Sequence, residues 1–146
     1  NEEAYCGALA VVLSIQSVLQ HGQWNWSDLI AKLPDSGTRD RLRVFSDFSD
    51  DDSLLDIARK YRCSGYVVES VPFALLAARA MNVRGFETVL FELARAGGDV
   101  DTNASIASPI YGVQATLTGF SDIDFNRIIE WSMIDATFRR FADLAQ

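Results

Sequence analysis

The run GGDVDT, residues 97–102, separates two segments of this chain that have helical periodicity. Its two glycines relax the backbone and are typical of a helix end, and small residues that favour a new helix follow. Asp99 and Asp101 stand at alternate positions, and the hydroxyl of Thr102 comes directly after them. Carboxylate and hydroxyl oxygens are the ligands that Mg²⁺ and Ca²⁺ prefer, so the run is a candidate cation site. The same acids are suited to capping the next helix, and spacing alone leaves both interpretations open.

Apolar residues recur at helical spacing on both sides of this run. Pro72 is expected in the first turn of its helix, and Pro109 is expected to kink the long helix that contains it. No alternating strand pattern and no internal repeat is visible, so the sequence predicts a single all-α domain over residues 1–146. The expected helices are residues 3–20, 28–33, 38–45, 53–61, 71–82, 86–96, 101–120 and 124–145.

Composition limits the possible partners. A formal net charge of −7 without a basic patch argues against binding to nucleic acid or to an anionic membrane. No uninterrupted apolar run reaches about 18 residues and no signal peptide is recognisable, so neither a membrane span nor export is expected. Cys6 and Cys63 are too few for a disulfide framework and are interpreted as buried thiols, which favours the cytoplasm. His21, the only histidine, is expected as a cation at a helix end rather than as a catalytic residue.

The most acidic stretch, residues 46–53, also allows two interpretations. It is either an exposed loop whose last residues cap the following helix, or a second cation site. Crowded carboxylates repel one another, but water and salt screen that repulsion well at a surface. The capped loop is therefore favoured.

Three segments, in order along the chain, carry a resemblance to a known family. They are EAYCGALA at residues 3–10, GYVVES at residues 65–70 with an alanine-rich helix after it, and GGDVDTNASIA at residues 97–107. Together they resemble the carboxy-terminal half of the ADP-ribosylglycohydrolase family. The resemblance implies an orthogonal helical bundle, part of the ADP-ribosylglycohydrolase fold. It also implies cleavage of the glycosidic bond between ADP-ribose and a protein side chain or related acceptor.

The resemblance assigns a metal-binding role to the glycine and aspartate run. Asp99, Asp101 and Thr102 would be the carboxy-terminal ligands of a magnesium pair, which makes Mg²⁺ the implied cofactor. Gly97 and Gly98 would let the backbone approach the ligand.

A second group would lie along the ADP-ribose cleft, namely Ser64, Gly65 and Tyr66. Tyr66 is the candidate to stack on the ligand or to hydrogen-bond to it, with a buried structural tyrosine as the alternative. In the family chemistry the cations polarise ribose hydroxyls and orient a water, while a carboxylate assists the attack of that water. The implied partner is ADP-ribose or an ADP-ribosylated protein.

Part of the family pattern has no counterpart in this sequence. The family's Thr-Asp-Asp run and its acid/base carboxylate would precede Asn1, while the acids at 50–52 come after the family's middle helix. No catalytic residue is therefore assigned, and we expect weak Mg²⁺ binding and no hydrolysis by this chain alone. Because the sequence begins at Asn1 rather than at a methionine, one interpretation is a piece of a longer hydrolase. The alternative is a truncated, non-catalytic binding or assembly module whose uncovered apolar helix faces associate as a homodimer.

Overall fold

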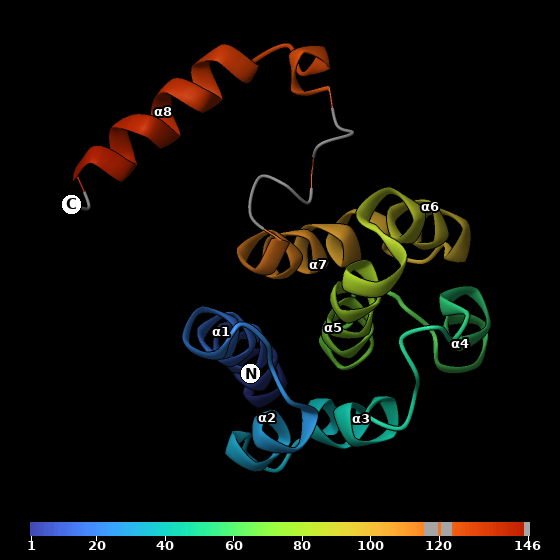
Figure 1. Cartoon of the computed structure of the whole chain (residues 1–146). Coiled ribbons are helices and arrows are strands. Elements are labelled where there is room, and N and C mark those ends of the chain that lie inside the picture. The colour runs from blue at the N-terminus through green and yellow to red at the C-terminus, as the bar shows by residue number, and fades with distance from the viewer. Residues whose placement is uncertain (116–119, 121–123, 145–146) are drawn as a thin grey trace.

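A computed structural model describes residues 1–115, 120 and 124–144 of the chain. These residues form eight α-helices and a 3₁₀ helix, with no strand among them, which confirms the predicted all-α class. The elements are α1 (Glu2–His21), α2 (Trp26–Lys32), α3 (Gly37–Phe45), α4 (Leu54–Tyr61), α5 (Val67–Arg84), α6 (Phe86–Ala96), α7 (Val100–Ala115), η2 (Phe125–Arg127) and α8 (Trp131–Leu144) (Figure 1).

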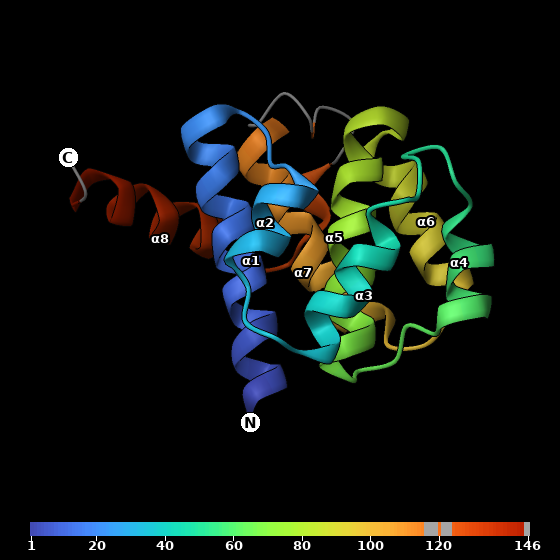
Figure 2. The same ribbon diagram turned by 90° about the horizontal axis from the view of Figure 1, so that it is seen from below.

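Helix α5 lies at the centre of the bundle (Figures 1 and 2). It contacts α1, α3, α4, α6 and α7, and α7 in turn packs against α1 and α6. Residues 70–78 of α5 are buried without interruption. The alanines in this run let neighbouring helices approach closely, while Phe73, Leu75 and Leu76 fill the space between those helices. A helix covered on all sides needs no polar face, which explains its continuous apolar sequence.

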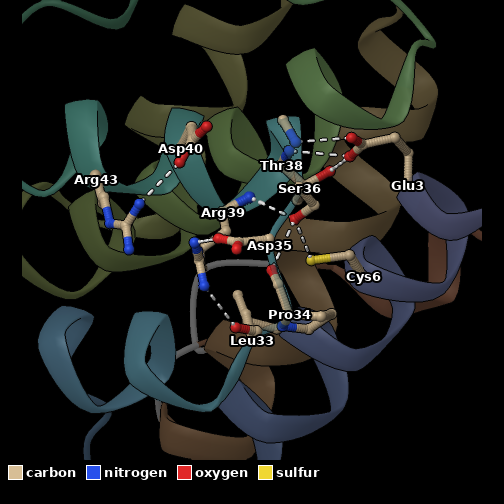
Figure 3. A network of polar contacts seen from close by, with 11 residues as sticks. Glu3, Cys6, Leu33, Pro34, Asp35, Ser36, Thr38, Arg39, Asp40 and Arg43 are labelled. Carbon is tan, nitrogen blue, oxygen red and sulfur yellow. Dashed lines mark hydrogen bonds and ion pairs between the residues drawn. The ribbon is translucent and has the colours of Figure 1, made fainter.

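Helices α1 and α3 are joined by a network of polar contacts (Figure 3). The Glu3 carboxylate accepts hydrogen bonds from the backbone N–H groups of Gly37, at 2.7 Å, and Thr38, at 3.0 Å. It also accepts one from the Thr38 hydroxyl at 2.8 Å. Ser36, the N-cap residue of α3, donates its hydroxyl hydrogen to the Cys6 sulfur at 2.9 Å. Glu3 thus satisfies N–H groups at the start of α3 that have no partner within their own helix.

Both cysteines are buried free thiols, as the sequence predicts. Cys6 lies in α1, and Cys63 lies in the segment that connects α4 to α5. His21 occupies the last turn of α1, where the negative end of the helix dipole stabilises a positive charge.

The two predicted helices that contain a proline compare differently with the structure. Helix α5 begins at Val67 rather than at residue 71, so the expectation of Pro72 in the first turn is wrong. The Tyr66 carbonyl accepts hydrogen bonds from the N–H groups of Glu69 and Ser70, which starts the helix ahead of the proline. Helix α7 continues through Pro109 and is described to Ala115. Its predicted extension over residues 116–119 lies outside the described residues.

Helix α8 stands apart from the bundle (Figures 1 and 2). The predicted helix at 124–145 is wrong at its start, because η2 and a turn precede Trp131. Its predicted end at residue 145 lies outside the described residues. Helix α8 packs against η2, and none of its residues is buried. Phe138 and Phe141 are 69% and 71% exposed, so this helix adds almost nothing to the core.

Helix α1 carries an exposed apolar face. Tyr5, Val12 and Leu19 lie on it, opposite the buried Cys6 and Ala10. Within the described part of the chain, α1 alone is long and apolar enough to cross a membrane by length and composition, although its apolar residues are interrupted by polar ones. The core helix of a soluble protein meets the same criterion.

Candidate functional site

The glycine and aspartate run lies between the end of α6 and the start of α7. Gly97 and Gly98 both have positive φ, 74° and 71°, a conformation that glycine adopts without strain. The Asp99 side chain accepts a hydrogen bond from the N–H of Thr102 at 3.3 Å, and its carbonyl accepts one from the N–H of Asn103 at 3.0 Å. Asp99 therefore caps α7, as the structural interpretation of the sequence predicted. Capping uses one carboxylate oxygen and does not prevent the other from binding a cation.

The side chains of Asp99 and Asp101 lie next to each other at this helix start. Hydrogen bonding with the Asp101 side chain and with the Thr102 side chain and amide lowers the pKa of Asp99, against a weaker opposing effect of desolvation. Asp99 and Thr102 are partly exposed, and Asp101 is exposed. A partly exposed carboxylate with a lowered pKa is ionised at neutral pH.

The segment between α4 and α5 packs directly against this helix start. A Cβ on Gly65 would overlap a carboxylate oxygen of Asp99, and a Cβ on Gly98 would overlap the Cys63 carbonyl oxygen. The N–H of Asp99 donates a hydrogen bond to that carbonyl at 3.0 Å. A side chain at position 98 would overlap backbone, so only glycine fits there, whereas a side chain at position 65 would require the Asp99 side chain to move. The structure thus brings Gly65 and Asp99 together although they are far apart in the sequence.

Glu69, in the first turn of α5, holds the same segment from the other side. Its carboxylate accepts hydrogen bonds from the Ser64 hydroxyl at 2.6 Å and from the Ser64 N–H at 3.2 Å. The Ser64 hydroxyl oxygen in turn accepts a hydrogen bond from the N–H of Tyr66 at 3.2 Å. The hydrogen bonds from Ser64, aided by Arg62 and Arg41, lower the pKa of Glu69 despite partial burial. Burial and the Glu69 charge raise the pKa of the Cys63 thiol.

Tyr66 is 55% exposed beside Gly65, so it is not the buried structural tyrosine of the alternative interpretation. Its ring is free to contact a ligand at the surface. The structure thus packs two groups of predicted site residues against each other. One is the segment with Ser64, Gly65 and Tyr66, and the other is the run with Gly97, Gly98, Asp99 and Asp101.

Two residues that position this region, Asn103 and Glu69, were not singled out from the sequence. Asn103 is 1% exposed and donates a hydrogen bond from Nδ2 to the Cys63 carbonyl at 2.9 Å. A polar residue on the buried face of α7, in register with Ala107, Ile110 and Tyr111, is the signal by which it could have been found.

The donor set suits a magnesium ion in part. Two carboxylates and one hydroxyl are hard oxygen ligands, and Mg²⁺ is commonly held by one or two carboxylates while it keeps several waters. Among the described residues, no group of three or more His, Cys, Asp or Glu side chains is placed to hold a metal. Asp99, Asp101 and Thr102 therefore fit as a partial set of ligands that water or other groups would complete.

The acidic stretch at 46–53 has structural roles. Ser53 caps α4 by accepting a hydrogen bond from the N–H of Asp56, and Asp52 accepts one from the N–H of Ser49 at 2.7 Å. Asp50 forms an ion pair with Arg79 of α5. These contacts support the capped loop as the interpretation of this stretch.

The fold and the run before α7 define the chain as an all-helical protein with paired acidic side chains at a helix start. A model of the ADP-ribosylglycohydrolase family matches residues 1–126, and the chain belongs to this family. Comparison with curated proteins and with solved structures finds no match. The family match covers the segment between α4 and α5 and the start of α7, and it ends before α8.

Proposed function

We propose that this chain supplies the magnesium-binding and ADP-ribose-facing side of an ADP-ribosylglycohydrolase site. One observation carries the proposal. The Asp99 carboxylate lies against Gly65, with Asp101 beside it and the exposed Tyr66 next in the chain. The two segments together form a surface that offers negative charge, an open backbone and an aromatic ring.

Each element of this surface has a proposed task. Asp99, Asp101 and Thr102 hold Mg²⁺, which when bound polarises ribose hydroxyls and orients a water. Gly65 and Gly98 allow the two segments to pack closely, and Gly97 leaves open space in which the backbone can approach a ligand. Ser64 and Tyr66 contact the ADP-ribose, Tyr66 through its ring or its hydroxyl.

The described residues include no carboxylate that we assign as the acid or base of hydrolysis. Asp99 and Asp101 are committed to the cation, and Glu69 is committed to Ser64. We therefore propose binding without hydrolysis for residues 1–146 alone, and cytoplasmic location on the basis of the two free thiols.

Isothermal titration calorimetry tests this function. ADP-ribose with Mg²⁺ is titrated into the wild type, into the D99N/D101N double variant and into D56N as the matched control. Asp56 is an exposed aspartate in the first turn of α4, so D56N removes one such charge at another helix start, where the double variant removes two. We expect magnesium-dependent binding to the wild type and to D56N, and its loss in D99N/D101N. Equal heats for all three proteins, or no binding by a protein that joins this chain to an upstream family segment, would refute the proposal.

Self-association is a second proposed function, and the exposed apolar faces of α1 and α8 favour it. Tyr5, Val12 and Leu19 on α1 and Phe138 and Phe141 on α8 are all more than half exposed. Apolar surface of this kind is commonly covered by a partner, most simply in a symmetric homodimer. Sedimentation equilibrium tests this. A concentration-dependent dimer that the F138D/F141D variant abolishes supports the proposal, and a monomer at high concentration overturns it.

A further inference from the structure

The Cys63 carbonyl group is one of the contacts that hold the segment connecting α4 to α5. The others include the hydrogen bonds from Ser64 to Glu69 and one from the Cys63 thiol to the Gly97 carbonyl at 3.3 Å. The Cys63 carbonyl oxygen accepts two hydrogen bonds from the start of α7, one from the N–H of Asp99 at 3.0 Å and one from Nδ2 of Asn103 at 2.9 Å. The first is a backbone bond that any residue except proline would make at position 99. The second depends on the identity of the side chain at 103.

Asn103 is costly at this position for stability. It is 1% exposed and lies on the face of α7 that is otherwise lined by Ala107, Ile110 and Tyr111. Its Oδ1 is buried and has no hydrogen-bond partner among the residues that the structure describes. A buried acceptor without a partner is unfavourable, and an apolar side chain would avoid that cost. A buried polar side chain that lowers stability is expected where the residue serves another purpose, such as positioning a functional site.

The contacts around Asn103 suggest that purpose. Its carboxamide fixes Cys63, two residues before Gly65, and its own N–H bonds to the Asp99 carbonyl. Gly65 in turn lies directly against the Asp99 carboxylate. A shift of this segment away from α7 would therefore change the distance between Gly65 and Asp99.

We propose that Asn103 is a positioning residue, which fixes the segment at 64–66 against the carboxylates of Asp99 and Asp101. It acts through the Cys63 carbonyl and touches neither cation nor ADP-ribose. The claim that Asn103 holds this segment rests on the structure alone. The claim that its loss weakens cation binding rests also on the proposed function.

The test replaces Asn103 by leucine, which has a similar size and no hydrogen-bonding groups. N82L is the matched control, since the Asn82 carboxamide bonds to Gln114 and to the Ala78 carbonyl at the other end of α5. Three quantities are measured on each protein. They are the thermal midpoint, the hydrogen exchange of the Asp99 amide by NMR, and the affinity for Mn²⁺ by electron paramagnetic resonance.

We expect N103L to melt no lower than the wild type, while its Asp99 amide exchanges at least tenfold faster and its Mn²⁺ affinity falls about tenfold. N82L should leave the exchange and the affinity at wild-type values. A purely structural role for Asn103 would lower the melting temperature and leave the affinity of the folded protein unchanged, which would overturn the inference. If N103L does not fold, N103A, which introduces no clash, gives the same comparison.

Failure of the inference differs from failure of the proposed function. If the wild type binds no Mn²⁺, the cation site is wrong, and the exchange of the Asp99 amide still decides whether Asn103 holds the segment. If the wild type binds Mn²⁺ and N103L binds it equally well with an equally protected Asp99 amide, the inference alone is wrong.

Discussion

Replacement of Glu3 by alanine should weaken the junction between α1 and α3. The Glu3 carboxylate accepts three hydrogen bonds from Gly37 and Thr38, and two of the donors are N–H groups at the start of α3. Hydrogen bonds to charged groups contribute about 1.5–3 kcal/mol, and loss of a helix cap costs roughly 1 kcal/mol. The three bonds share one partly exposed carboxylate, and water replaces some of them in the variant. We therefore expect E3A to lower the free energy of unfolding by about 2 kcal/mol.

The pH dependence of this loss has a definite sign. Burial alone would raise the pKa of Glu3, but the hydrogen bonds from Thr38 and Gly37 outweigh it and lower the pKa below its ordinary value of 4.5. The contribution of Glu3 is therefore fully present above about pH 4.5 and is lost as the pH falls through the lowered pKa. The difference in stability between wild type and E3A should shrink in that acidic range.

Urea unfolding followed by circular dichroism measures both effects, at neutral pH and in steps below about pH 4.5. E2A is the matched control, because Glu2 is exposed in the same first turn of α1 and carries the same charge. It should change stability by no more than about 0.5 kcal/mol. If E3A is no less stable than E2A, or if its deficit persists undiminished in acid, the reasoning about the junction is wrong.

Three further predictions concern the site and α8. G98A should lower the free energy of unfolding by roughly 3 kcal/mol, because it adds a clash with the Cys63 carbonyl to the strain of a positive φ. The control G22A, at φ 73° with open space around it, should lower it by only about 1 kcal/mol. Equal losses in urea unfolding would contradict the predicted clash. Burial and the Glu69 charge raise the pKa of the Cys63 thiol. At mildly alkaline pH the thiol should therefore react with iodoacetamide far more slowly than it does in the urea-unfolded protein. Equal rates for the folded and unfolded proteins would refute this protection. Truncation after residue 130 should change the free energy of unfolding by less than about 1 kcal/mol, since no residue of α8 is buried, and a larger loss would mean that α8 packs on the bundle.

The sequence predicts most of the helices because each carries a local signal. Ser53 and Ser36 cap α4 and α3, and glycines follow the ends of α1, α5 and α6. The sequence predicts the start of α5 four residues late, because Pro72 favours a position in a first turn. Burial on all sides stabilises that helix beyond the local preference of one proline.

The composition of the candidate site was accessible from the sequence, but its internal geometry was not. The residues of the run at 97–102 mark it as a candidate cation site, and the resemblance adds the segment at 64–66 as a separate motif. Their contact depends on the packing of α4, α5, α6 and α7, which local patterns do not encode. The roles of Asn103 and Glu69 follow from hydrogen bonds to Cys63 and Ser64, so they emerged only from the structure.

Localisation of a bound cation tests the central claim most directly. Substoichiometric Mn²⁺ is added to the isotope-labelled protein, and paramagnetic broadening of the backbone amides is recorded by NMR. We predict that the amides of residues 97–103 and 64–66 broaden first, and that D99N/D101N removes this broadening while D56N keeps it. Broadening centred on the acidic residues 46–53, or spread evenly over the surface, would contradict a cation site at the start of α7.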